Sequence, residues 1–112
     1  MKTFGSVCSG VGIGDFGLLM AGLKPLYFCE INPYRRKILA LRYPEAKVFK
    51  DLKTIHEKKI PKTNVLLGTL PCQPYSKLGK RKGQEDPRHL WPDFFALVKK
   101  TKPELIITEN VP

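Results

Sequence analysis

Cys72 is the residue of this sequence whose surroundings best suit nucleophilic chemistry. It lies in the run Leu70-Pro71-Cys72-Gln73-Pro74, after a short apolar segment, so its thiol belongs to a loop and not to a buried strand. Prolines on both sides fix the local backbone. Nearby positive charge would favour the thiolate, and it comes from Lys77, Lys80, Arg81 and Lys82. We therefore predict that Cys72 acts as a nucleophile.

A carboxyl group is predicted beside that thiol. Glu109 follows the apolar run that ends at Thr108, and Cys72 follows the run that ends at Gly68. If the two runs are neighbouring parallel strands, their carboxyl ends meet at one edge of the sheet. A carboxylic acid there can donate a proton or a hydrogen bond to a ring nitrogen while a thiolate attacks an electron-poor ring. Without the cysteine motif, the sequence would give no reason to treat Glu109 as more than an ordinary carboxylate at the end of a strand.

A glycine-rich turn follows the first apolar run. It reads Ser9-Gly10-Val11-Gly12-Ile13-Gly14, and its alternating glycines let the backbone turn tightly and approach a ligand. Glu30 lies about 20 residues further on, at the end of the second run, where an acidic side chain can accept hydrogen bonds from both ribose hydroxyls. The phosphate-binding pattern G-x-x-x-x-G-K-S/T is absent. We predict a nucleoside site without a phosphate contact; a plain turn and a solvated carboxylate are the alternatives.

A second acid follows the third apolar run. Asp51 is placed to accept a hydrogen bond from an adenine amino group, while the neighbouring Leu52 covers the face of the ring. The alternative is that Asp51 caps the first turn of a helix. The spacing alone leaves both interpretations open.

The elements that must position these residues form a parallel α/β pattern. Short apolar runs alternate with connections of about helix length, which is typical of a parallel sheet. The predicted strands are Thr3 to Cys8, Pro25 to Cys29, Lys47 to Phe49, Asn64 to Gly68 and Glu104 to Thr108. The predicted helices are Asp15 to Ala21, Pro33 to Tyr43 and His89 to Thr101, with a further short helix within Leu52 to Lys59.

Two helix boundaries carry local signals. Gly22 suits the left-handed position after the first helix, and Asn32 with Pro33 suits the start of the second. The connection from Thr69 to Arg88 is rich in Gly, Pro, Gln and Lys and has no apolar periodicity. A loop of that length in a compact domain is typically functional or disordered.

The composition of the chain limits which classes of protein it can belong to. The 112 residues fit one domain, and the formal net charge of +10 favours a polyanionic partner, nucleic acid before anionic lipid. Three widely spaced cysteines fit neither a disulfide framework nor a paired metal site, and Cys8 and Cys29 are expected to be structural. The sequence shows no apolar run of membrane-spanning length and no signal-peptide pattern, so we expect a cytoplasmic protein.

In motif order, the chain resembles the DNA cytosine-5 methyltransferase family over nearly its whole length. The run "SGVGIGDFGLLMAG" is similar to the family's first cofactor motif, "PCQPYSKLGKRKGQEDPR" to its catalytic loop and "ENVP" to its glutamate motif. The resemblance implies a Rossmann-like fold with strand order 3-2-1-4-5. It makes residues 1–112 the N-terminal part of a catalytic domain, of the kind found in restriction-modification systems.

The resemblance also implies S-adenosylmethionine as the cofactor. Glu30 stands where the family has its ribose-binding acid, and Asp51 where it has its adenine-pocket acid. The full set of cofactor-binding residues that it implies is Ser9, Gly10, Gly12, Gly14, Glu30, Ile31, Asp51, Leu52 and Pro71.

The mechanism that the resemblance implies acts on double-stranded DNA. The target cytosine is flipped out of the helix, the Cys72 thiolate adds to ring carbon six, and carbon five then takes the methyl group. Glu109 would hold the ring through its third nitrogen and exocyclic amine. Gln73 would help to fill the gap left by the flipped base, and the DNA backbone would be approached by Ser76, Lys80 and Arg81.

The chain departs from the family's pattern at three positions. Cys8 stands where members usually have an aromatic residue, Ile13 where they have a glycine, and Ile31 where they often have a tryptophan. Two of these positions contact adenine in the family, so the resemblance implies weaker packing against that base.

The sequence also ends at Pro112, without the family's later arginine motif or its target-recognition domain. We therefore expect a partial enzyme, inactive alone, that needs a complementing C-terminal subunit. The fifth strand would be a free sheet edge that favours such a partner or self-association, with marginal stability of the isolated chain. The alternatives are a methyltransferase-like protein that binds DNA or cofactor without turnover, and a relative that methylates tRNA.

Overall fold

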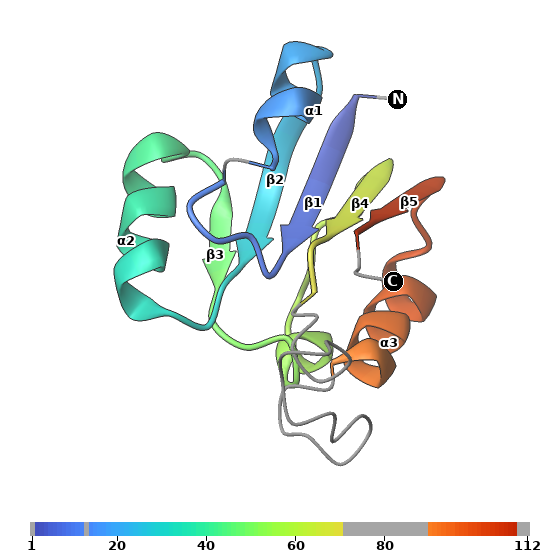
Figure 1. The fold of residues 1–112 in the computed structure, drawn as a ribbon. Coiled ribbons are helices and arrows are strands. Elements are labelled where there is room, and N and C mark those ends of the chain that lie inside the picture. Colours follow the sequence, from blue (N-terminus) through green and yellow to red (C-terminus); the bar gives the residue numbers. More distant parts are fainter. Residues whose placement is uncertain (1, 13, 71–89, 110–112) are drawn as a thin grey trace, which may run out of the picture.

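The computed structural model describes residues 2–12, 14–70 and 90–109. Five parallel strands form one sheet in the order β3-β2-β1-β4-β5 (Figure 1). The strands are β1 (Thr3–Val7), β2 (Lys24–Cys29), β3 (Lys47–Phe49), β4 (Val65–Gly68) and β5 (Leu105–Thr108). The predicted α/β class and strand order are confirmed.

The strand boundaries agree with the prediction to within one residue, and one difference has a local cause. β1 ends at Val7 and not at Cys8, because Cys8 has φ +54°, in the left-handed region that a strand cannot contain. The chain therefore leaves the sheet at Cys8 and enters the glycine turn at once.

Helices cover both faces of the sheet. On one face, α1 (Phe16–Met20) and α2 (Pro33–Arg42) pack on a cluster that includes Phe4, Phe28 and Val65. On the other face, α3 (Trp91–Thr101) and the short 3₁₀ helix η1 (Ile55–Glu57) pack on a cluster that includes Tyr27 and Leu66. Successive side chains of β2 and β4 thus point into the two clusters in turn, because neighbouring residues of a strand face opposite sides of the sheet.

The predicted caps of the first two helices are present. The side chain of Asn32 accepts hydrogen bonds from the backbone amides of Tyr34 at 2.9 Å and Arg35 at 3.1 Å, and Pro33 opens α2. Gly22 has φ +88° directly after the end of α1. These contacts satisfy amides and carbonyls that a helix end leaves without partners.

The predicted short helix within Leu52 to Lys59 is present as a 3₁₀ helix, η1. The backbone amides of Thr54, Glu57 and Lys58 each donate to the carbonyl three residues back, where an α-helix would use the fourth. Pro61 follows closely, and a proline disfavours helical geometry in the residue before it. The segment therefore forms only η1, whose Ile55 is buried.

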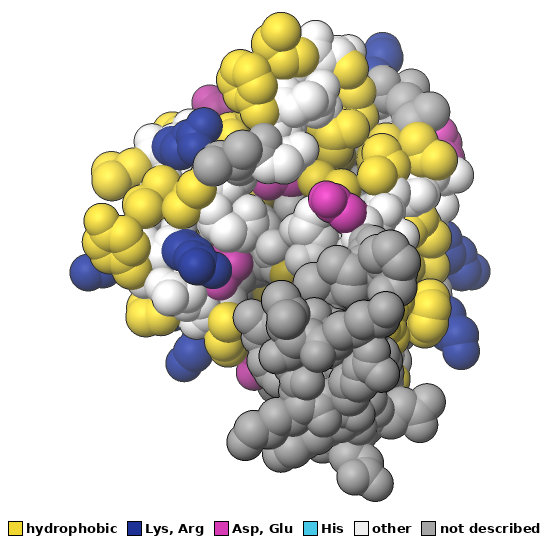
Figure 2. Space-filling model, in the orientation of Figure 1, with side chains coloured by type: hydrophobic (Ala, Val, Ile, Leu, Met, Phe, Trp, Pro, Cys, Tyr) yellow, Lys and Arg dark blue, Asp and Glu magenta, His cyan; other side chains and the backbone are white. Residues whose placement is uncertain are grey.

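Large apolar side chains are exposed over the face formed by α1 and α2 (Figure 2). They include Phe16, Met20, Tyr34 and Leu41. In the part of the chain that the structure describes, no helix is long and apolar enough to cross a membrane.

Candidate cofactor pocket and nucleophile edge

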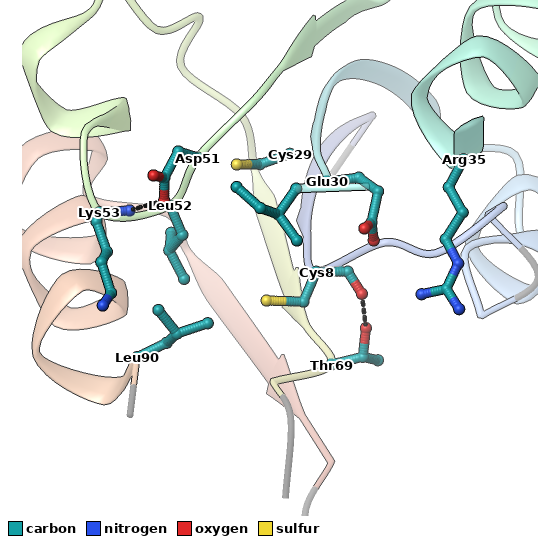
Figure 3. A pocket seen from close by; sticks show the side chains of 10 residues that line it. Cys8, Cys29, Glu30, Arg35, Asp51, Leu52, Lys53, Thr69 and Leu90 are labelled. Carbon is teal, nitrogen blue, oxygen red and sulfur yellow. Dashed lines mark hydrogen bonds between the residues drawn. The ribbon is translucent and has the colours of Figure 1, made fainter. Parts of the chain in front are cut away.

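A pocket of about 460 Å³ opens beyond the carboxyl ends of β1 to β4 (Figure 3). Each of these strands contributes the residues that directly follow it or close it, as expected for a ligand site of an open parallel sheet. The lining residues are Cys8, Cys29, Glu30, Ile31, Arg35, Asp51, Leu52, Lys53, Thr69 and Leu90. All four pocket residues predicted from the ends of β2 and β3 are among them.

Glu30 is the best-anchored acid of the pocket. One carboxylate oxygen accepts from the backbone amide of Gly10 at 2.8 Å, and the other accepts from the amide of Asn32 at 2.9 Å. The residue is only 5% exposed, yet its carboxylate points into the pocket (Figure 3). Glu30 is therefore no solvated strand-end carboxylate, because it joins the glycine turn to the start of α2.

Asp51 lines the pocket and does not cap a helix. Its side chain accepts from the backbone amide of Lys53 at 2.9 Å, within the turn that precedes η1, whose N-cap residue is Thr54. Leu52 is buried and lines the pocket beside it, while Ile31 lies on the rim with 61% of its surface exposed. One side of the pocket thus offers a carboxylate next to apolar surface.

The glycine turn shapes the pocket without lining it. Gly10 and Gly12 have φ of +60° and +86°, which only glycine adopts without strain. The hydroxyl of Ser9 lies 2.8 Å from that of Ser6, and its backbone amide donates to the Cys29 carbonyl. The predicted residues Ser9, Gly10, Gly12 and Gly14 are not part of the pocket's lining.

A buried acid that the sequence analysis missed lies next to this turn. Asp15 is 1% exposed, and burial raises the pKa of its carboxyl, an effect partly offset by a hydrogen bond with Ser6. One of its carboxylate oxygens has no hydrogen-bond partner. An aspartate directly before a short helix predicts a cap, but this side chain makes no capping bond.

Cys8 and Cys29 form part of the pocket's floor. Burial, followed by the nearby charge of Glu30, raises the thiol pKa of Cys8 to about 12. Burial, followed by the neighbouring Cys8 thiol and the Asp51 carboxylate, raises the thiol pKa of Cys29 to about 12 as well. Both thiols are therefore neutral and weakly nucleophilic, in agreement with a structural role.

Four further lining residues were not predicted from the sequence: Arg35, Lys53, Thr69 and Leu90. Thr69 follows β4 at the same edge as the predicted acids, and its hydroxyl donates to the Cys8 carbonyl at 2.8 Å. The end of the predicted fourth strand could therefore have indicated that Thr69 lies at the pocket. Arg35 lies in the first turn of α2, and Leu90 directly precedes α3; neither position follows a strand.

The predicted carboxylate at position 109 lies at the expected edge. β5 pairs with β4 in parallel, with Gly68 opposite Thr108, so Glu109 and Thr69 both follow the paired ends. Glu109 is exposed. The predicted nucleophile and its neighbours lie outside the described residues; they are Cys72, Pro71, Gln73, Ser76, Lys80 and Arg81.

Comparison with known proteins identifies the family. Residues 2–112 match the family model described as C-5 cytosine-specific DNA methylase. The chain belongs to this family.

The curated relatives agree with this assignment. The chain is 35% identical over 106 residues to the type II methyltransferase M.NgoMIV of Neisseria gonorrhoeae, with 94% of the chain and 34% of the relative covered. It is 34% identical over 103 residues to the type II methyltransferase M.HhaI of Haemophilus parahaemolyticus, with 89% and 31% covered. The chain thus spans about a third of the length of these family members.

Solved structures share the fold of this C-5 methylase chain. A protein encoded within an Escherichia coli prophage superimposes with a TM-score of 0.74 at 24% identity, covering 100% of this chain and 32% of that one. The Dnmt2 methyltransferase of S. pombe gives a TM-score of 0.66 at 22% identity, with 99% and 36% covered. The Rossmann-like fold of the family member is therefore confirmed.

Proposed function

We propose that this chain is the cofactor-binding, nucleophile-bearing N-terminal part of a DNA cytosine-5 methyltransferase. S-adenosylmethionine would bind in the pocket beyond β1 to β4, and the chemistry would take place at the adjoining edge between β4 and β5. The position of Glu30 is the observation that carries the proposal, because it sets an anchored carboxylate inside a nucleoside-sized pocket.

The lining of the pocket fits such a cofactor. Its volume of about 460 Å³ falls within the usual range of small-molecule sites. Each oxygen of Glu30 accepts one backbone amide, so each keeps a lone pair with which to accept a ribose hydroxyl. Leu52 and Ile31 offer apolar surface to an adenine ring, and Asp51 offers an acceptor for its amino group.

The chemistry of the proposal belongs to Cys72 and Glu109. The Cys72 thiolate adds to carbon six of a flipped-out cytosine, forming a carbon–sulfur bond and raising the electron density at carbon five. Glu109 holds the ring through its third nitrogen and exocyclic amine and stabilises the charge that develops there. S-adenosylmethionine, when bound, supplies the methyl group to carbon five. Loss of the proton from carbon five then expels the Cys72 thiolate.

Duplex DNA is the proposed substrate, and its phosphates suit the chain's excess of 20 Lys and Arg over 10 Asp and Glu. Ser76, Lys80 and Arg81 would contact the DNA backbone, and Gln73 would occupy the space of the flipped base. Because the chain covers about a third of its relatives, sequence recognition would come from a C-terminal segment or complementing subunit.

Isothermal titration of S-adenosylmethionine tests the pocket assignment. The wild-type chain and the Cys72→Ala variant should bind the cofactor equally, and the Glu30→Ala variant should bind it at least about tenfold more weakly. Equal binding by the Glu30→Ala variant would refute the pocket assignment.

A substrate comparison tests the nucleic acid. With the C-terminal segment supplied, methylation of duplex DNA should exceed that of tRNA. A preference for tRNA would assign the chain to an RNA-directed function, and cofactor binding without turnover on either substrate would leave only a binding function.

A further inference from the structure

The far end of α2 contacts the glycine turn through residues that do not line the pocket. Arg42, in the last turn of α2, donates from its guanidinium to the carbonyl of Val11 at 2.9 Å. The guanidinium also lies over the ring of Tyr43, 5.6 Å from its centroid. Neither Arg42 nor Val11 lines the pocket, so this contact is separate from the cofactor-facing residues.

Tyr43 supports the turn at the next residue. A Cβ placed on Gly12 would lie 3.0 Å from the ring of Tyr43, so the turn's backbone rests directly on that ring. The ring is in turn stacked on Phe28 of β2, with centroids 4.8 Å apart. The C-terminal end of α2 therefore provides both a donor and a rigid surface for Val11 and Gly12.

The pocket side of the same turn is held by Glu30. The amide of Gly10 donates to its carboxylate at 2.8 Å, one residue before the carbonyl that Arg42 binds. Within the turn, the amide of Gly12 donates to the Ser9 carbonyl at 3.0 Å. Glycines have many accessible conformations, so this short segment needs such external contacts to keep one shape.

We propose that Arg42 is a positioning residue for cofactor binding, which acts through the Val11 carbonyl to keep the glycine turn in the shape that joins Gly10 to Glu30. The inference rests on the proposed function for its link to S-adenosylmethionine. Arg42 does not touch the cofactor. Its hydrogen bond fixes one side of the turn, so that the Glu30 carboxylate stays oriented towards the pocket on the other.

A simpler role for Arg42 is stabilisation of the helix end, because a cation in the last turn interacts favourably with the helix dipole. That role predicts a small change in melting temperature and no change confined to the turn. The test therefore needs a measurement on the turn itself, independent of cofactor binding.

The shape of the turn can be measured by hydrogen exchange of the Gly10 and Gly12 amides, followed by NMR in the 112-residue chain without cofactor. Arg42→Ala should speed exchange at both amides by about fivefold and leave the β1 and β2 amides unchanged. Arg42→Lys, which keeps a cationic donor, should restore part of the protection. Lys37→Ala is the matched control, because it removes one positive charge from the exposed side of the same helix.

Titration of S-adenosylmethionine into the same variants completes the experiment. Arg42→Ala should weaken binding by about fivefold, with Lys37→Ala equal to wild type. If wild type itself binds no cofactor, the proposed function fails, and the exchange result alone still decides the role of Arg42 in the turn. Unchanged exchange at Gly10 and Gly12 in Arg42→Ala, or equal effects in Lys37→Ala, would overturn the inference.

Discussion

Glu30 illustrates how one side chain can serve both the fold and the site. Its carboxylate accepts the amides of Gly10 and Asn32, and these bonds hold it towards the pocket. The sequence predicted the acid from its place after the second strand. It could not predict the two backbone donors, because these depend on how the turn and α2 approach each other in three dimensions.

Replacing Glu30 by Gln should weaken both the stability of the fold and the binding of the cofactor. The amide group keeps one acceptor oxygen but turns an N–H group towards a backbone donor, which leaves a buried amide without its partner. We expect a loss of stability of about 2 kcal/mol and at least a tenfold loss of S-adenosylmethionine affinity, measured by thermal unfolding and titration calorimetry. Glu45→Gln is the control, because Glu45 is highly exposed and its ion pair with Lys24 spans 3.9 Å. Wild-type affinity in the Glu30 variant would contradict the assignment.

The three cysteines should differ in reactivity. Burial raises the thiol pKa of Cys8 and Cys29 to about 12, so both stay protonated in the folded chain well above neutral pH. Because the folded chain keeps both thiols neutral, ionisation of these thiols opposes folding. Their contribution to the free energy of unfolding is therefore fully present below their ordinary pKa and is lost as the pH rises towards 12. At pH 8, iodoacetamide should therefore label Cys72 first, with Cys8 and Cys29 reacting far more slowly because little of either thiol is ionised. Peptide mass spectrometry measures this order, and equal labelling of all three would contradict it.

Among residues, those that follow strands were predictable and those on helices were not. Glu30, Ile31, Asp51 and Leu52, which the sequence predicts to bind a cofactor, line one pocket, because apolar runs reveal strand ends and parallel strands share one edge. Arg35 was missed because its place in the pocket depends on the angle at which α2 leaves β2. No local pattern in the sequence encodes that angle.

Among elements, the sheet was predictable because its strands are short, apolar and buried. The sequence placed every strand to within one residue, and local capping signals placed the start of α2. The predicted short helix within Leu52 to Lys59 is present as η1, whose three-residue length and 3₁₀ geometry no pattern in the sequence indicated.

The contact between β1 and β2 depends on the missing side chain of Gly5. A Cβ at this position would lie 2.2 Å from the ring of Tyr27, which is fully buried. Gly5→Ala should therefore destabilise the chain by roughly 2 kcal/mol through overpacking. Chemical denaturation measures the loss.

Gly17→Ala is the matched control for that substitution. Gly17 lies within α1, and an added Cβ would meet no atom within 4 Å. Alanine there should leave stability unchanged or raise it by up to about 1 kcal/mol, because it favours the helix. Similar losses in both variants would show that the Tyr27 contact is not the cause.

At the scale of the whole molecule, β5 is the feature that favours association. Among the described residues it pairs with β4 alone, and its Leu105, Ile106 and Ile107 are each at least 37% exposed. An exposed apolar edge strand offers unpaired backbone groups to another chain. On the proposed function, a complementing segment would add to the sheet at this edge.

The 112-residue chain should therefore self-associate through β5 in the absence of such a segment. Sedimentation velocity at rising concentration should show dimers or larger species, and Ile106→Lys should shift the chain towards monomer because it places a charge on the edge. Leu41→Lys, on the exposed side of α2, should not change the association. A wild-type chain that stays monomeric at high concentration would contradict the prediction.

Covalent trapping on duplex DNA that contains 5-fluorocytosine tests the central claim most directly. With S-adenosylmethionine and the C-terminal segment supplied, the chain should form a denaturation-resistant DNA adduct that peptide mapping places on Cys72. Because fluorine at carbon five cannot leave as a proton, the thiol stays attached, and Cys72→Ser should form no adduct. An adduct on Cys8 or Cys29, or methylation of ordinary DNA by the Cys72→Ser variant, would contradict the account.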